Sequence, residues 1–100
     1  MSLFKQSGLI QVLGSDTGGL YVDMSDVVFI AVYYDTEFLE DLELGTVYIP
    51  HVRIKTSTSK YTWCGTVCES EEQAKQIVSR AQQNILHAIN QNLSSLTLRI

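Results

Sequence analysis

The chain has 100 residues, of which 45% are hydrophobic and 18% are charged, and its net charge is −4. This length accommodates one hydrophobic core and the composition excludes a largely disordered chain, so we expect a single domain over residues 1–100. No stretch approaches the roughly 20 apolar residues of a membrane-spanning helix, and the N-terminus lacks a signal-peptide pattern. We therefore predict a cytoplasmic protein with no membrane insertion.

The charged residues are distributed unevenly. Eight carboxylates and no Lys or Arg lie between Lys5 and Arg53, whereas six Lys and Arg and three acids lie from Arg53 onward. Because non-specific affinity for nucleic acid comes from Lys and Arg, we predict no nucleic-acid partner. We interpret the acidic stretch as a solvated loop, with head-to-tail self-association through opposite charges as the alternative.

The first third of the chain has the pattern of antiparallel strands. Residues 9–13 and 20–24 are largely apolar, and residues 15–19 between them favour a tight turn, so a β-hairpin is expected. After a short corner at Ser25 and Asp26, the apolar and aromatic run 27–34 predicts a central strand covered on both faces. Residues 35–45 break this pattern and predict a short helical turn or an ordered loop.

Residues 47–56 predict the next strand. Its alternate positions form an apolar face, Tyr48, Val52 and Ile54, and a basic face, His51, Arg53 and Lys55. Pro50 cannot donate to a ladder and indicates an edge or a bulge. The basic face, with Lys60 nearby, suits a phosphate or carboxylate ligand or the acids of residues 35–43. We favour the acids, because opposite charges in one small domain offset each other over short distances.

Residues 61–68 predict the last strand before the helix, with Trp63 as an anchor of the core. Cys64 and Cys68 would then lie about 13 Å apart along an extended strand. That separation excludes a disulfide between them. We expect two reduced, half-buried thiols.

Residues from about Ser70 to Asn92 predict one long amphipathic helix. Ser70 is the expected N-cap, Gln73 completes a capping box, and Glu71 and Glu72 suit the positive end of the helix dipole. Apolar residues recur at spacings of three and four, which predicts a stripe facing a sheet. The stripe consists of Ala74, Ile77, Val78, Ala81, Ile85, Ala88 and Ile89.

The other face of this helix is the candidate interface. No Lys, Arg, Asp or Glu occurs between Arg80 and Arg99, and Leu86 lies off the stripe among amides. Residues 96–100 alternate as a strand would, and such a tail could add to the sheet edge of a neighbouring copy. The expected interface residues are Leu86, Gln82, Gln83, Asn90, Leu96 and Leu98.

Residues that could perform chemistry lack the spacing that catalysis or metal binding needs. The triplet at 16–18 spells the Asp-Thr-Gly of aspartic proteases, but the resemblance does not extend, and a turn is expected instead. The residues of zinc-binding type, His51, His87, Cys64 and Cys68, do not form converging pairs. No phosphate-binding loop occurs. We predict no catalytic residues, no metal and no cofactor.

Antiparallel strands followed by one capped helix resemble a pleckstrin-homology-like domain in pattern. The resemblance implies a bent antiparallel sheet closed by the helix, but the expected turn around Asp16 lacks the basic residues that bind phosphoinositides. We therefore expect an α+β fold, with a curved antiparallel sheet of about five strands packed by one long C-terminal helix.

Two classes of function fit this expectation. The first is a small non-catalytic domain for protein interaction or assembly, acting by self-association or on another protein. The alternative is a small-molecule binding protein or minor enzyme, with a pocket between helix and sheet lined by Tyr33, Tyr48, Trp63 or the cysteines. We favour the first because of the uneven charge, the uncharged half of the helix and the strand-like tail.

Overall fold

The computed structural model describes residues 2–14, 21–40 and 45–100 and has the expected α+β composition. Within these residues, six strands form two three-stranded sheets, so a single five-stranded sheet is not observed. The elements are β1 (Leu9–Leu13), β2 (Tyr21–Asp23), the 3₁₀ turn η1 (Met24–Asp26), β3 (Val27–Leu39), β4 (Gly45–Thr56), β5 (Lys60–Cys64), α1 (Glu71–Asn90) and β6 (Ser95–Arg99).

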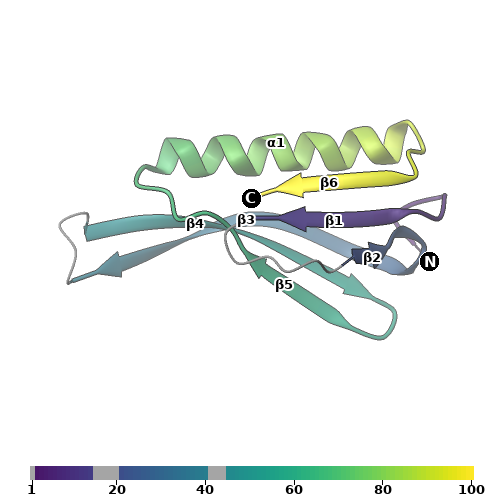
Figure 1. Cartoon of the computed structure of the whole chain (residues 1–100), viewed down its shortest axis with the longest axis horizontal. Coiled ribbons are helices and arrows are strands. Elements are labelled where there is room, and N and C mark those ends of the chain that lie inside the picture. Colours follow the sequence, from purple (N-terminus) through teal and green to yellow (C-terminus); the bar gives the residue numbers. More distant parts are fainter. Residues whose placement is uncertain (1, 15–20, 41–44) are drawn as a thin grey trace.

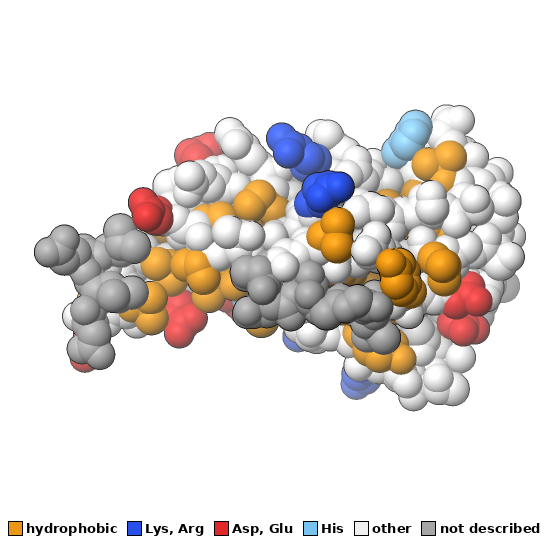
Figure 2. Space-filling model, viewed as in Figure 1, with side chains coloured by type: hydrophobic (Ala, Val, Ile, Leu, Met, Phe, Trp, Pro, Cys, Tyr) orange, Lys and Arg blue, Asp and Glu red, His pale blue; other side chains and the backbone are white. Residues whose placement is uncertain are grey.

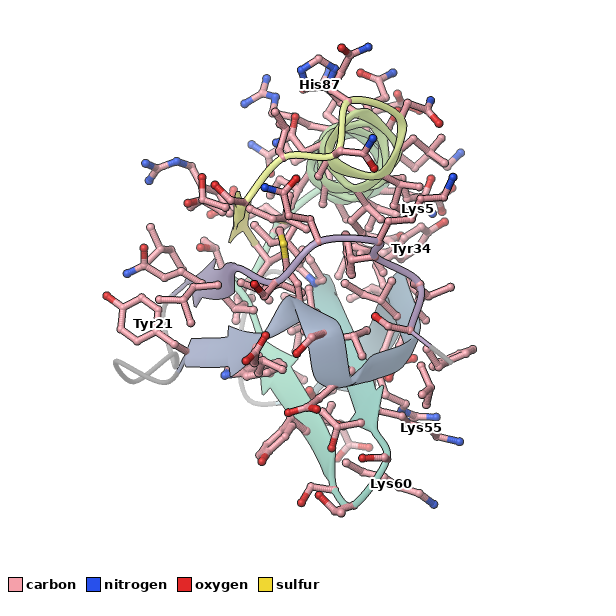
Figure 3. All side chains as sticks on the ribbon, turned by 90° about the vertical axis from the view of Figure 1, so that its right-hand side faces the viewer. Lys5, Tyr21, Tyr34, Lys55, Lys60 and His87 are labelled. Atoms are coloured by element: carbon pink, nitrogen blue, oxygen red, sulfur yellow. The ribbon has the colours of Figure 1, made fainter. Side chains whose placement is uncertain are left out.

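The two sheets and the helix enclose one core. Sheet A has the order β2-β1-β6 and sheet B the order β3-β4-β5, with α1 lying above both (Figures 1 and 3). Sheet A contributes Ile10, Val12 and Leu98, all almost fully buried, and sheet B contributes Val52 and Ile54. Trp63, exposed by only 7%, joins the same core, as its size and its place in the alternation predict.

The C-terminal strand is confirmed, and its partner lies in the same chain. β6 pairs with β1 in parallel, from Leu9 opposite Ser95 to Leu13 opposite Arg99. Parallel neighbours need a long crossover connection, which the strands of sheet B and α1 supply here. The β1–β2 hairpin is also confirmed, whereas the expected turn at 15–19 and the Asp-Thr-Gly triplet lie outside the described residues.

The prediction for β3 is wrong in two respects. The strand continues through Asp35 to Leu39, where a helical turn or a loop was expected; residues 41–44 lie outside the described residues. β3 is also an edge strand of sheet B, and Phe29 on it is 43% exposed, so its two faces are not both covered. The strand is longer than expected because twelve residue pairs with β4 hold it extended despite its acidic residues. Its faces are less covered than expected because apolar content indicates burial only on average.

Pro50 lies in the central strand of sheet B, at the point where the β5 ladder stops. The last β4–β5 pair joins His51 to Cys64, and the Pro50 carbonyl accepts a hydrogen bond from the Gly65 N–H at 2.7 Å. Pro50 has no N–H to donate on this side, so the β4–β5 ladder stops here; the expected edge or bulge at Pro50 is not observed, because β4 is the central strand and the register shift of its pairing with β3 lies between Val27 and Phe29. The strand expected over 61–68 ends at Cys64, and Cys68 returns only as a single bridge to Tyr48.

The helix is confirmed together with its cap. The Ser70 side chain accepts from the Gln73 N–H and the Gln73 side chain accepts from the Ser70 N–H, which completes the capping box. Five stripe residues are buried, and Ile77 and Ile89 are partly buried against the core. The helix ends at Asn90, two residues before the expected end, and Asn92 follows with a φ of 51°, which suits asparagine better than most residues.

Replacing Ser70 with alanine is expected to lower the free energy of unfolding by about 0.5–2 kcal/mol, because it leaves an N–H of the first turn without its acceptor. Urea denaturation measures this change. Ser79→Ala, at an exposed position within the same helix, is the control and should cause no loss of stability. Equal effects of the two substitutions would contradict a capping role for Ser70.

The pleckstrin-homology-like pattern agrees with the structure only at the level of sheets and one long helix. Here a strand follows the helix and pairs in parallel with β1, which the antiparallel pattern did not include. No helix in the described part of the chain combines the length and apolar character needed to cross a membrane.

Candidate functional site

A groove runs between α1 and the edge strand β3. It has a volume of about 390 Å³ and is lined by Ile30, Ala31, Val32, Gln82, Ile85 and Leu86. The Gln82 side-chain amide donates to the Val32 carbonyl at 3.2 Å, so the helix satisfies part of the free edge of β3. Leu86 remains 59% exposed above this contact. We call this feature the α1–β3 groove.

Neither wall of the α1–β3 groove carries a formal charge. Residues 27–34 of β3 and residues 81–90 of α1 include no Lys, Arg, Asp or Glu. Removing water from an uncharged surface costs little free energy. Charged side chains on the wall would instead need oppositely charged partners on binding. The α1–β3 groove therefore suits an apolar, uncharged segment.

The structure divides the expected interface residues into two groups. Leu86, Gln82, Gln83 and Asn90 are exposed on α1, and the first two line the α1–β3 groove. Leu96 and Leu98, by contrast, are exposed by only 5% and 0% because β6 buries them in the core of its own chain. Those two side chains are therefore structural, and the expectation that they form an interface is corrected.

Exposed apolar residues elsewhere are scattered. On the side of the molecule seen in Figure 2, hydrophobic side chains appear as separate small patches among polar ones. Isolated apolar residues are normal on protein surfaces and indicate no site by themselves. The α1–β3 groove differs because its apolar side chains line one hollow.

A second surface is the outer face of sheet B, which points away from the core. Its central row crosses the sheet from Tyr33 on β3 through His51 on β4 to Cys64 on β5. The Tyr33 and His51 rings are stacked with their centroids 5.3 Å apart. The remaining members are Phe29, Ala31, Asp35, Glu37, Val47, Ile49, Arg53, Lys55, Lys60 and Thr62, from alternation along the paired strands; of these, Val47 is buried.

Two basic residues of this outer face lie on aromatic rings. The Arg53 guanidinium lies 5.7 Å from the centre of the Tyr33 ring and the Lys55 ammonium 5.4 Å from the centre of the Phe29 ring. Neither cation lies within ion-pair distance of a carboxylate in the described residues, so the favoured pairing with the acids of 35–43 is not seen there. Among the described residues, His51 alone approaches one of these acids, with Nδ1 at 3.7 Å from Asp35.

A hollow of about 440 Å³ at the acidic end of this face holds Asp35, His51 and Cys64 but no catalytic arrangement. His51 Nδ1 lies 2.8 Å from the Ile49 carbonyl, so this nitrogen carries the proton and donates it. The ring stacks on Tyr33, and no hydrogen bond joins it to the Cys64 thiol in the described structure. A nucleophile needs its base within hydrogen-bond reach, and Cys64 lacks that partner.

The other residues considered for chemistry are separated. Cys68 is buried, and burial raises the pKa of its thiol, which disfavours the reactive thiolate. His87 lies on the side of α1 away from the sheets (Figure 3). The described residues include no group of three or more His, Cys, Asp or Glu placed to hold a metal ion.

The aromatic residues expected to line a small-molecule pocket between helix and sheet do not come together, although Cys68 lines a hollow of about 300 Å³ with Gln73, Gln76 and Ile77 of α1. Trp63 is packed in the core and stacks on Tyr61 at 5.9 Å, and Tyr48 meets Tyr34 edge-on at 6.1 Å. Tyr33 lies on the opposite face of sheet B, with its ring against His51. These aromatic side chains therefore do not surround one cavity.

Leu86 and Gln82 of the α1–β3 groove were expected from the sequence as interface residues, but the part that β3 plays in the groove was not. The pairing of Arg53 with Tyr33 and of Lys55 with Phe29 was not expected either, because cross-strand neighbours depend on register. The alternation of rings and cations in both strands is the signal that could have suggested such pairs.

No family model, curated protein or solved structure matches this chain.

Proposed function

We propose that this chain is a small, non-catalytic protein-interaction domain that binds an apolar, uncharged segment of a partner protein in the α1–β3 groove. The observation that carries the proposal is the exposure of Leu86, 59%, at the rim of a hollow whose other apolar members are Ile30, Ala31, Val32 and Ile85. An exposed leucine beside an apolar hollow gives a partner an anchor and a site to fill.

The position of β3 supports this proposal. An edge strand presents backbone groups that pair readily with another chain unless they are protected. On β3, the Val32 carbonyl accepts a hydrogen bond from the Gln82 side-chain amide, and α1 packs alongside the strand. A partner would therefore bind through side chains in the α1–β3 groove, with Gln82 as a neutral polar contact.

Leu86→Arg is expected to weaken partner binding at least tenfold. Covering the exposed part of this leucine contributes about 1–2 kcal/mol, and burying an unpaired charge adds a further cost. Titration of the purified complex by calorimetry measures the change. Leu9→Arg is the matched control, because Leu9 is 53% exposed on sheet A, away from the α1–β3 groove.

The partner itself can be captured with a photo-crosslinking residue placed at position 86 and, as a control, at position 9. We expect a discrete protein adduct from position 86 alone, and we expect the captured protein to bind the purified domain with Leu86-dependent affinity. Equal capture from both positions, or no adduct from position 86, would contradict the proposed function.

Three further expectations belong to this proposal. The first is a likeness to pleckstrin-homology-like domains, supported by two packed sheets beneath one capped helix, although β6 departs from that pattern. The second is a cytoplasmic location with no nucleic-acid partner. The third is self-association, for which the outer face of sheet B offers a separate surface.

A further inference from the structure

Opposite charges occupy the two ends of the outer face of sheet B. Counted from the central row of Tyr33, His51 and Cys64, the next row on one side holds Asp35, and the row beyond it holds Glu37. In the other direction, the first row holds Arg53, and the second holds Lys55 and Lys60. The face is therefore acidic at one end, basic at the other and aromatic in the middle.

We propose that this outer face binds a second copy of the chain in a two-fold symmetric dimer. The two-fold axis lies in the interface, perpendicular to the strands, and crosses the Tyr33–His51–Cys64 row. Rotation about that axis exchanges the two ends of the face. The row of Asp35 then lies opposite the row of Arg53 of the second copy, with the two side chains on adjacent strands, and the row of Glu37 lies opposite the row of Lys55 and Lys60 of the second copy. This contact is independent of the α1–β3 groove.

The spacing of the charges selects this axis. Successive rows on one face lie about 6.7 Å apart, so Asp35 and Arg53 are about equally distant from the central row, as a two-fold axis requires. An axis parallel to the strands would instead place Asp35 against Asp35 and Arg53 against Arg53. Like charges facing each other cost energy, whereas complementary ends attract and set the register.

The charged side chains on this face are available to a partner. Arg53 and Lys55 lie on the rings of Tyr33 and Phe29, which leaves them without a carboxylate partner in the described residues. Asp35 has 64% of its side chain exposed and, in the part of the chain that the structure describes, pairs with His51 alone, at 3.7 Å. Figure 3 shows Lys55 and Lys60 at the end of the molecule farthest from α1, where the helix does not obstruct them.

The area of the face limits how tightly two copies can associate. The five rows extend about 30 Å along the strands, three of them across three strands and two across β3 and β4 alone, which gives about 400 Å² per copy and about 800 Å² in total. This is below the usual size of a stable interface and fits a weak complex. We therefore expect a dimer that forms and dissociates with concentration, and that weakens in 1 M NaCl, where screening acts over about 3 Å.

Two charge-reversal variants test the proposal by sedimentation equilibrium. Variant one, Asp35→Lys with Glu37→Lys, makes both ends basic, and variant two, Arg53→Glu with Lys55→Glu, makes both ends acidic. Each variant alone is expected to raise the dimer Kd at least tenfold. An equimolar mixture should form a heterodimer, because the changed positions 35 and 53, and 37 and 55, then face each other with opposite charges, and only Lys60 of variant two keeps a like-charged neighbour. A chain carrying all four changes should dimerise again.

Matched controls separate this contact from other effects. Lys75→Glu with Arg80→Glu changes the net charge as variant two does, but on α1, and should leave dimerisation intact. Leu86→Arg should also leave it intact, so failure of the proposed function and failure of this dimer are distinguishable. A monomer at every concentration, no heterodimer on mixing, or growth beyond two copies by head-to-tail contact would overturn the proposal.

Discussion

Replacing Leu98 with alanine is expected to lower the free energy of unfolding by about 2–5 kcal/mol, a large share of the stability of a domain of this size. Leu98 is fully buried in β6, which pairs with β1 and packs against α1. The truncated side chain would leave a cavity where both sheets and the helix meet. Urea denaturation followed by circular dichroism measures the change.

Thr97→Ala is the control for this prediction, because Thr97 lies next to Leu98 on β6 but is exposed. We expect it to cost less than about 1 kcal/mol, the range of strand propensity alone. Similar losses from the two substitutions would mean that β6 stabilises the domain by backbone pairing alone. That outcome would contradict the assignment of Leu98 to the core.

Replacing Gly8 with alanine is expected to destabilise the domain by about 3 kcal/mol or more, at the upper end of the range for overpacking. A Cβ at this position would lie 2.6 Å from the carbonyl carbon of Ser94 and 2.8 Å from its Cα, and closer still to its oxygen. All three atoms belong to the backbone, so no side-chain rotation can relieve the contact. Thermal unfolding measures the loss.

The hydrogen bonds around Gly8 explain why the backbone cannot move away. The Gly8 carbonyl accepts from the Met24 N–H at 2.8 Å, and the Ser94 carbonyl accepts from the Leu9 N–H at 3.2 Å. Separating the two segments would therefore disturb the first pairs of both β1 ladders. Ser7→Ala, at the exposed neighbouring residue, should have little effect, and an unchanged melting temperature for Gly8→Ala would show that the segments separate freely.

Features that depend on neighbours in the sequence could be predicted well. The capping box at Ser70 and Gln73, the apolar stripe of α1 and the alternation of the C-terminal strand involve residues within about a turn or a few positions of each other. For the same reason, the exposure of Leu86 opposite the stripe was evident from helical periodicity. Half of the proposed site, its helical wall, was therefore available from the sequence.

Features that depend on pairing between distant segments were decided only by the tertiary structure. The sequence by itself determined that residues 96–100 would be extended, but the parallel pairing with β1 turned Leu96 and Leu98 from interface candidates into core. Likewise, the register of β3 against β4 placed Arg53 on Tyr33 and extended β3 through its acids. Local patterns report conformation and amphipathicity, whereas partner, register and edge position arise from the packing of the whole chain.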